Sequence, residues 1–309
     1  MEIRIGIDLG GTKIEAAALN PSGALIHRQR VATPQGDYRA TVQAISTLIE
    51  TLERINDTPG LSVGIGTPGA LSPKTGRVIN ANSVCLIGQP LDRDLEKALG
   101  RSVRLANDAD CFALSEAIDG AAAGAETVFG VILGTGVGGG LVVQGRLVSG
   151  PNGIAGEWGH NPMPWPTAEE LPGPACYCGK RGCVETFLSG PGLAADHLRV
   201  WGEEVTPRGL VQQSEAGAVQ AEATLRQYEA RLARALAGVI NLLDPHVVVL
   251  GGGLSNLERL YGRVPEMWGR HVFSDRVETR LVKAKYGDSS GVRGAAWLWG
   301  RGESVEEGT

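Results

Sequence analysis

The residues best suited to chemistry begin with a loop of exceptional glycine content. Five glycines lie among the seven residues Gly134–Gly140, between two predicted strands, Val128–Leu133 and Leu141–Val143. Glycine reaches positive φ angles and lets backbone N–H groups converge on an anion, usually a phosphate. A hairpin turn would need only one or two glycines. The spacing also fits G-x-G-x-x-G, but a strand follows where a dinucleotide site needs a helix. The loop therefore predicts phosphate binding.

A second loop of this kind follows the predicted strand Ile3–Asp8 and carries Gly10, Gly11, Thr12 and Lys13. Its glycines permit close backbone approach, while the threonine hydroxyl and the lysine ammonium can bind phosphate oxygens. Asp8 can hold Mg²⁺ or its water shell, because hard cations prefer carboxylate oxygen. Taken alone, this loop is equally compatible with a plain hairpin.

Three cysteines and one histidine predict a metal site. Cys176, Cys178 and Cys183 have the spacing C-x-C-x₄-C, and His160 lies sixteen positions before the first. One nitrogen and three sulfurs form the ligand set of a closed, tetrahedral structural zinc site. Reduced thiols in a surface loop are the alternative. With four protein ligands there is no open position, so the zinc is expected to hold a loop and to perform no hydrolysis.

The segment Ala106-Asn-Asp-Ala109 lies between a predicted strand, Ser102–Leu105, and a predicted helix, Cys111–Ile118. Asn107 or Asp108 can simply cap the helix, which is a very common use of these residues. A carboxylate at the carboxyl end of a strand can instead point into the crevice where α/β proteins bind ligands. The local sequence alone favours the cap.

Composition excludes several classes of function. The chain has 309 residues, a formal net charge of −5 and an apolar content of 42%, as expected for a soluble globular protein. A net negative charge does not favour nucleic acid or anionic lipid as a partner. Charged residues interrupt the first apolar run before a secretion signal can form, and no run approaches the length of a membrane span. We therefore expect a cytoplasmic protein without membrane or nucleic-acid partners.

Several helices are predicted from apolar periodicity and capping residues. Asp37 can cap a helix that runs to about Ile55, with apolar residues at three- and four-residue steps. Further helices are predicted at Leu91–Leu99, Gly217–Leu243 and Ser290–Leu298. These helices alternate with short apolar strands, a pattern typical of α/β domains.

A third glycine cluster, Gly251–Gly253, follows the predicted strand Val247–Leu250. Two glycine hairpins can clamp a polyphosphate from opposite sides, and the third cluster can admit an adenine over its backbone. Both halves of the chain begin with a strand, a glycine loop and a strand, which suggests an internal duplication. We expect two α/β domains that close on a nucleotide, formed by residues 1–120 with about 288–309, and by residues 121–287.

The motifs together resemble those of the ROK family, the sugar kinases and repressors of the actin/hexokinase-like (ribonuclease H-like) ATPase superfamily. The resemblance covers essentially the whole chain. It rests on Asp8–Lys13, Ala106–Ala109, Leu133–Gly140, Gly156–His160 and Cys176–Glu185. It implies a two-domain α/β fold. Within the family the pattern is most similar to bacterial manno(fructo)kinases, whereas N-acetylglucosamine kinases share most of the motifs.

The resemblance implies a role for each matching residue. Asp108 would be the general base, which reverses the preference for a helix cap. ATP phosphates with Mg²⁺ would bind the two hairpin loops, and the adenosine would lie by Gly251, Gly252 and Gly253. The expected nucleotide-site residues are therefore Asp8, Gly10, Gly11, Thr12, Lys13, Gly134, Thr135, Gly136, Gly138 and Gly139, besides the third glycine cluster. Sugar hydroxyls would contact Asn82, Asn107, Glu157, His160 and Glu185, and His160 would also bind zinc.

The implied activity is ATP-dependent phosphorylation of the 6-hydroxyl of fructose, with mannose or glucose as slower substrates. N-acetylglucosamine is the alternative, because the spacing of the motifs does not reveal how sugar hydroxyls are placed. A repressor of the same family would carry a helix-turn-helix segment before the first strand, which here begins at Ile3. A non-catalytic sugar sensor is disfavoured by the intact Asp108. Homodimers are common in this family, and one is expected here.

Overall fold

The computed structural model describes residues 3–81 and 83–300 and divides into two compact units. The first comprises Met1–Gly124, Gly140–Ala155 and Asp288–Thr309, and the second comprises Ala125–Gly139 and Gly156–Gly287. Residues 140–155 thus belong to the first unit, whereas the predicted division assigned them to the second domain. Within the described residues, no helix combines the length and the apolar composition that a membrane span requires.

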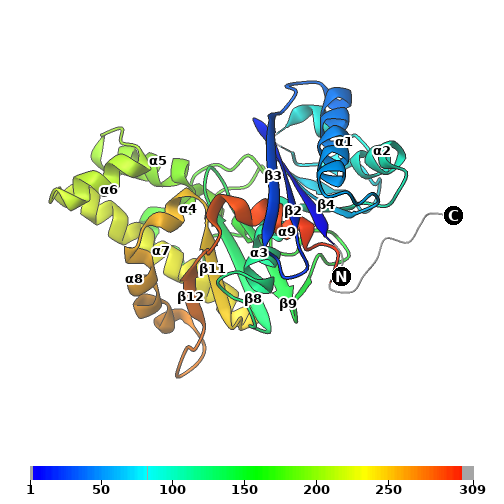
Figure 1. Ribbon diagram of the computed structural model, residues 1–309. Coiled ribbons are helices and arrows are strands. Elements are labelled where there is room, and N and C mark those ends of the chain that lie inside the picture. The colour runs from blue at the N-terminus through cyan, green and yellow to red at the C-terminus, as the bar shows by residue number, and fades with distance from the viewer. Residues whose placement is uncertain (1–2, 82, 301–309) are drawn as a thin grey trace. The chain divides into compact units, whose positions relative to one another are not determined.

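The first unit is built around a five-stranded sheet in the order β3-β2-β1-β4-β7 (Figure 1). Its strands are β1 (Arg4–Leu9), β2 (Lys13–Leu19), β3 (Leu25–Ala32), β4 (Ser62–Thr67) and β7 (Arg104–Asn107). The smaller strands of this unit are β5 (Ala70–Leu71), β6 (Val78–Ile79) and β10 (Arg146–Leu147). Its helical segments are α1 (Tyr38–Ile55), α2 (Leu91–Leu99), α3 (Asp108–Ile118), α9 (Ser290–Ala296), η1 (Val84–Leu86) and, at its border, η6 (Gly287–Ser289).

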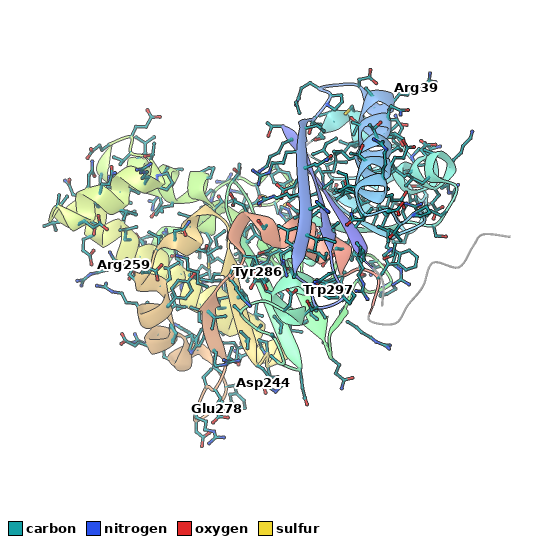
Figure 2. All side chains as sticks on the ribbon, in the orientation of Figure 1. Arg39, Asp244, Arg259, Glu278, Tyr286 and Trp297 are labelled. Carbon is teal, nitrogen blue, oxygen red and sulfur yellow. The ribbon has the colours of Figure 1, made fainter. Side chains whose placement is uncertain are left out.

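One face of this sheet packs on α1 and α2, where apolar side chains of the strands and helices form a fully buried core. Helix α9 covers the other face so closely that two positions on the strands beneath it have no room for a side chain. A Cβ on Gly6 would collide with the carbonyl oxygen of Val292, and one on Gly64 with that of Ala295. At the end of α9, Trp297, labelled in Figure 2, donates through Nε1 to Asp119 over 3.2 Å.

The second unit contains most of another five-stranded sheet, in the order β10-β9-β8-β11-β12. Its further strands are β8 (Thr127–Leu133), β9 (Val137–Val143), β11 (Val247–Gly251) and β12 (Arg280–Lys283). Its helices are α4 (Val184–Leu188), α5 (Gly190–Trp201), α6 (Pro207–Glu215), α7 (Val219–Leu243) and α8 (Arg259–Trp268). Its 3₁₀ turns are η2 (Trp158–His160), η3 (Ala168–Glu170), η4 (Gly253–Asn256) and η5 (Gly269–His271).

The two sheets repeat one topology. In the first, β1 pairs in parallel with β4, which pairs in parallel with β7; in the second, β8 pairs in parallel with β11, which pairs in parallel with β12. In each sheet the glycine-rich loop follows the first of these three strands. It leads to a strand that lies on the other side of that first strand, β2 in the first sheet and β9 in the second. This correspondence agrees with the internal duplication that the sequence suggested.

Candidate functional site

The strand-to-helix junction of the first unit places a buried carboxylate at the end of β7. Asn107 is the N-cap of α3, because its side chain accepts the N–H of Asp110 over 2.6 Å. Asp108 is therefore not the cap but the first helical residue, and its carboxylate accepts the N–H of Ala109 over 2.9 Å. Burial raises the pKa of Asp108, although the backbone N–H groups of Ala109 and Asp108 oppose this shift. A carboxylate with a raised pKa is suited to accept a proton.

Asp8 lies at the end of β1, opposite Glu15 of β2 in the sheet register. Burial raises the pKa of Asp8 to about 6, and the negative charges of Asp108 and Glu15 add to the effect, whereas Lys13 and Arg30 oppose it. The first unit therefore places the carboxylates of Asp8 and Asp108 close enough to disfavour each other's charge, beside its glycine loop. A divalent cation would relieve their repulsion, and carboxylate oxygens are the ligands that Mg²⁺ prefers. The residues present thus fit a magnesium ion.

Glu15 is almost fully buried and is neutralised by cations of the neighbouring strand. Its carboxylate pairs with Arg28 over 2.6 Å and with Arg30 over 2.5 Å, while the ammonium group of Lys13 lies 4.0 Å away. A buried carboxylate requires such partners. Lys13 is 47% exposed, so its side chain can turn from Glu15 toward a bound anion.

The loop between β1 and β2 is a tight turn braced from its flank. Gly10 donates its N–H to the carbonyl of Lys13 over 3.0 Å, so this N–H already has an acceptor inside the turn. The carbonyl of Gly11 accepts the side-chain amide of Gln35 over 2.6 Å, and the carbonyl of Thr12 accepts the N–H of Thr33 over 3.0 Å. These bonds fix the path of the backbone that is expected to meet the phosphates.

A small cavity of about 120 Å³ lies in the first unit beside Asn107. Its walls combine polar and apolar groups: Thr67, Ala70, Leu71, Leu105, Ala106, Asn107, Asp110, Ser149 and Gly153. It can hold a substituent of a few atoms, next to the junction that carries Asp108.

The glycine loop after β8 differs from its predicted conformation. No residue of Gly134–Gly140 has a positive φ angle. The glycines are needed there because other atoms approach the backbone: a Cβ on Gly139 would lie 2.7 Å from both the carbonyl oxygen of Gly156 and Cδ1 of Trp158. Trp158 also donates through Nε1 to the carbonyl of Gly138 over 3.0 Å. Close packing, not φ > 0, explains Gly136, Gly139 and Gly140 of this loop.

Glu185 at the start of α4 is attached to this loop. Its Oε2 accepts the N–H of Val137 over 2.9 Å, and a Cβ on Gly136 would lie 2.7 Å from the same oxygen. Gly134 donates its N–H to the carbonyl of Gly136 over 3.0 Å and accepts the N–H of Gly190 over 2.8 Å. A side chain at position 136 would therefore have to displace the carboxylate of Glu185.

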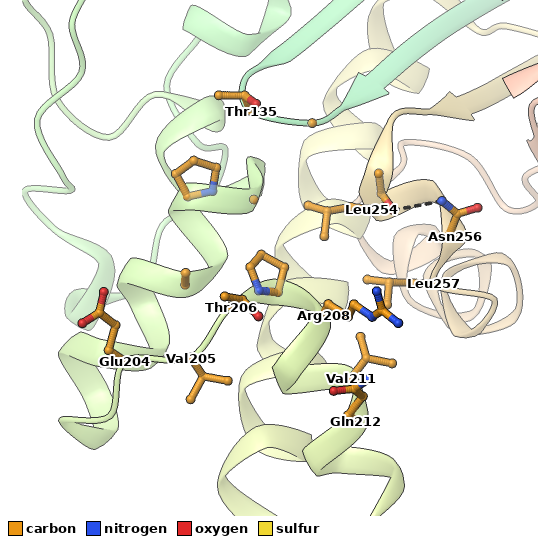
Figure 3. A pocket seen from close by; sticks show the side chains of 16 residues that line it. Thr135, Glu204, Val205, Thr206, Arg208, Val211, Gln212, Leu254, Asn256 and Leu257 are labelled. Carbon is orange, nitrogen blue, oxygen red and sulfur yellow. Dashed lines mark hydrogen bonds between the residues drawn. The ribbon is translucent and has the colours of Figure 1, made fainter. Parts of the chain in front are cut away.

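The second unit contains a pocket of about 920 Å³, which Figure 3 shows from close by. Two of its walls were expected: Gly134 and Thr135 from the glycine loop, and Gly253 from the third glycine cluster. Gly251 is the last residue of β11, and Gly252 turns the chain with a φ of 80°. A Cβ at Gly252 would lie 2.5 Å from the carbonyl oxygen of Leu133, which requires glycine at this turn.

A further wall of this pocket, which α5 and α6 supply, was not predicted from the sequence. Pro191 and Ala194 belong to α5, whereas Thr206, Pro207 and Arg208 belong to the start of α6 (Figure 3). Capping signals for both helices are present in the sequence. Ser189 caps α5 by accepting the N–H of Gly192, and Thr206 caps α6 by accepting that of Gly209; each is followed within two residues by proline, a common first-turn residue.

The structure brings the four predicted metal ligands together. One ligand atom from each of His160, Cys176, Cys178 and Cys183 lies within 4.8 Å of the others. Nδ1 of His160 is 3.6 Å from Sγ of Cys176, and the sulfurs of Cys178 and Cys183 are 3.6 Å apart. Sulfurs bound to one tetrahedral zinc at about 2.3 Å are about 3.8 Å apart, so these separations fit the metal.

The thiol of Cys183 also lies in an environment that disfavours its thiolate, an effect that a cation would relieve. Burial and the neighbouring thiols of Cys178 and Cys176 raise the pKa of Cys183 to about 12. A bound zinc ion deprotonates its cysteine ligands outright. The donor set, its compactness and its electrostatics all fit a structural zinc ion.

Two of the sugar-site candidates, Glu157 and His160, belong to the segment that contributes the histidine of this cluster. Glu157 precedes η2, and its carbonyl accepts the N–H of His160 over 3.4 Å. Nε2 of His160 lies 2.9 Å from the hydroxyl oxygen of Tyr177, and the two rings meet edge to face with centroids 5.1 Å apart. Asn82, the remaining candidate, lies outside the described residues.

A buried ion network anchors the segment that continues from His160. Arg231 of α7 donates to Glu170 over 2.8 Å and to Asp196 over 2.7 Å, and Arg234 donates to Glu170 over 2.6 Å. Although burial alone would raise the pKa of Glu170, the hydrogen bonds from Arg234 and Arg231 lower it to about 2. Arg234 also donates to the carbonyl of Trp165. The network fixes the chain between the metal cluster and α7.

Solved structures of similar proteins define the class of fold. A ROK hexokinase from Thermus thermophilus superimposes with a TM-score of 0.85 at 34% identity, over 96% of this chain and 97% of that one. A ROK glucokinase from Streptomyces griseus, solved with glucose and AMPPNP, gives a TM-score of 0.76 at 28% identity, over 96% and 98% of the two chains. The fold is the two-unit α/β fold of the actin/hexokinase-like ATPases, as the sequence predicted.

The chain belongs to the ROK family, whose family model matches residues 4–301. An N-acetyl-D-glucosamine kinase of Photobacterium profundum is 42% identical over 297 residues, which cover 95% of this chain and 98% of that protein. One of Vibrio cholerae is 41% identical over the same length, with the same coverage.

Proposed function

We propose that the protein is an ATP-dependent sugar kinase that phosphorylates the 6-hydroxyl of N-acetyl-D-glucosamine. The observation that carries this proposal is its similarity, along nearly the whole chain, to N-acetyl-D-glucosamine kinases at 41–42% identity. A buried carboxylate at Asp108, a glycine-lined pocket and a Cys/His cluster supply the groups that such a reaction needs.

This proposal reverses the order of substrates that the sequence favoured. Fructose came first there, because the motifs are most similar to those of manno(fructo)kinases, and N-acetylglucosamine came second. The relatives support N-acetylglucosamine better. The cavity of about 120 Å³ beside Asn107 offers a place for an acetamido group, with polar walls at Thr67 and Ser149 and apolar walls at Ala70 and Leu71.

The proposed chemistry centres on Asp108. Its carboxylate accepts the proton of the sugar hydroxyl while the hydroxyl oxygen forms a bond to the γ-phosphorus of ATP. The bond from that phosphorus to the β,γ-bridging oxygen breaks, and ADP leaves. Burial of Asp108 helps in two ways: it raises the basicity of the carboxylate, and it strengthens the hydrogen bond to the incoming hydroxyl.

The nucleotide is assigned to the glycine loops and to the pocket of about 920 Å³. The base and ribose would occupy the space between Gly253 and the start of α6, and the phosphates would extend to Gly134 and Thr135. Lys13 and Thr12 would contact phosphate oxygens. Asp8 would hold a magnesium ion, which neutralises charge on the transferred phosphoryl group when bound.

The sugar is assigned to Asn107, Glu157, His160 and Glu185, and zinc is assigned to the Cys/His cluster. In His160 these assignments use different atoms, since Nδ1 faces the cluster and Nε2 faces away from it. Metal binding at one nitrogen fixes the tautomer and presents the other as an N–H donor.

A sugar panel tests the proposed activity. With saturating ATP and Mg²⁺, ADP release should give the highest kcat/KM for N-acetylglucosamine, above glucose, mannose and fructose. A preference for fructose would overturn the substrate assignment but leave a kinase. Calorimetric sugar binding without any turnover would identify a non-catalytic sensor instead.

Zinc content tests the role of the Cys/His cluster. Protein purified without chelator should contain one zinc per chain, because the four donors are already gathered. Cys178→Ser should lose zinc, unfold at lower temperature and bind sugar more weakly, since the metal holds the segment that bears His160. Cys85→Ser is the matched control and should keep its zinc. Full-length wild-type protein without zinc would contradict the assignment.

A further inference from the structure

The two ring nitrogens of His160 have different neighbours. Nδ1 lies 3.6 Å from Sγ of Cys176, on the side of the metal cluster, and Nε2 lies 2.9 Å from the hydroxyl oxygen of Tyr177. A metal on Nδ1 requires the proton to be on Nε2. In the metal-bound tautomer, His160 therefore donates its single N–H to Tyr177.

Tyr177 is brought to His160 by a short hairpin rather than by core packing. Ala175 and Arg181 form a β-bridge, Cys176 donates its N–H to Lys180 over 2.9 Å, and Gly179 donates to Cys176 over 3.0 Å. Tyr177 lies at the tip of this turn and is 82% exposed. Its ring meets the imidazole nearly perpendicularly, at 89°. An exposed side chain at a hairpin tip can rotate into solvent at little cost.

The backbone of His160, in contrast, is held firmly. Met163 donates its N–H to Gly182 over 2.8 Å, Val184 donates to Asn161 over 2.9 Å, and Pro162 forms a β-bridge with Cys183. Of the two partners in the His160–Tyr177 bond, the tyrosine is therefore the one that can move.

We infer that Tyr177 is a competing hydrogen-bond partner of His160, which the sugar must displace, so that Tyr177 sets the affinity of the protein for its sugar. The inference rests on the proposed role of His160 in sugar binding. One N–H makes one strong hydrogen bond, so a sugar hydroxyl and the phenol cannot both accept it. Tyr177 thus orients the imidazole before the sugar arrives and is exchanged for it afterwards.

Replacing Tyr177 by phenylalanine tests this competition, because the ring contact stays and only the acceptor is lost. A net hydrogen bond contributes about 1 kcal/mol, which is about fivefold in an equilibrium constant. We expect Tyr177→Phe to bind N-acetylglucosamine up to about fivefold more tightly in calorimetry, with a matching fall in KM. Its kcat and zinc content should equal those of the wild type.

Tyr38→Phe is the matched control, since it removes a hydroxyl that donates to Asp94 in the other unit and should leave sugar affinity unchanged. Weaker sugar binding by Tyr177→Phe would show a direct sugar contact, and loss of zinc would show a purely structural role. Either result, or an unchanged affinity, overturns the inference. Wild-type protein that neither binds nor phosphorylates the sugar would instead overturn the proposed function.

Discussion

Asp108→Asn is expected to lower kcat for sugar phosphorylation by about 100-fold or more while sugar still binds with near-normal affinity. Asparagine keeps the size of the side chain and can accept the N–H of Ala109, as Asp108 does over 2.9 Å. It cannot take a proton at neutral pH, and general-base catalysis contributes about 10²–10⁴-fold. Loss in kcat without loss of binding identifies a group that acts in the transition state.

The pH profile of the wild type gives a second measurement. Because burial raises the pKa of Asp108, kcat should fall as the pH drops through that raised value. The acidic limb of the profile should disappear in the slow Asp108→Asn variant, whose residual turnover needs no deprotonated base.

The matched control is Asp37→Asn. Asp37 caps α1 by accepting the N–H of Ala40 over 3.0 Å. The change therefore makes the same substitution at the start of a helix, at an aspartate that has no expected role in catalysis. Its kcat should equal that of the wild type. If Asp108→Asn behaved like this control, Asp108 would serve only the local structure of α3.

Local signals in the sequence were sufficient for most elements of the first unit. The predicted helix Leu91–Leu99 has the same bounds in the structure, where Gly100 ends it in the left-handed conformation with a φ of 69°. The helix capped by Asp37 likewise runs to Ile55. In both cases apolar periodicity and the terminal residues indicate the same boundary, which makes a prediction from sequence reliable.

The walls of the large pocket show where such reasoning fails. Helices α5 and α6 carry clear N-caps, but they are short and partly exposed, so their apolar pattern is weak. Gly139 illustrates another limit. The high glycine content around Gly139 was recognised in the sequence. The reason for a glycine at this position is the close approach of Gly156 and Trp158, which depends on tertiary packing that the spacing of residues does not encode.

The gathering of the Cys/His cluster was predictable for the opposite reason. Cys176, Cys178 and Cys183 lie within eight residues, so only His160 had to be brought from a distance, and few residue types bind zinc. Sugar preference was not predictable, since in the proposed site it depends on the exact placement of polar side chains such as Asn107 beside a small cavity.

Asp8→Asn should inactivate the enzyme and at the same time stabilise the protein free of nucleotide and magnesium above pH 6. Asparagine cannot supply the anionic oxygen that a magnesium ion prefers, so we expect kcat to fall by at least about 100-fold, on the scale of the loss of one electrostatic catalytic group. The gain in stability follows from the environment of Asp8, where burial and the charges of Asp108 and Glu15 disfavour the carboxylate.

The sign of the pH dependence follows from the pKa of Asp8, which folding raises from its usual 3.8 to about 6. As the pH rises, the carboxyl group of Asp8 loses its proton at a lower pH in the unfolded chain than in the folded protein. The folded protein therefore loses stability as the pH rises from about 4 to about 6. Two pKa units correspond to about 3 kcal/mol, and partial exposure of the group reduces this to roughly 1–3 kcal/mol. Below about pH 4 Asp8 is protonated in both states, and the difference between aspartate and asparagine should vanish.

Urea unfolding of the wild type and of Asp8→Asn between pH 4.5 and 8.5, without nucleotide, magnesium or chelator, would measure the effect. Above pH 6 the variant should have the larger free energy of unfolding. The difference in this free energy between the variant and the wild type should shrink toward pH 4.5. Asp57→Asn is the matched control, because Asp57 is exposed and has a φ of 48° that asparagine also tolerates. It should show no such difference. An equal difference in the free energy of unfolding at every pH would mean that the change acts through packing. A fully active variant would show that Asp8 does not hold the magnesium ion.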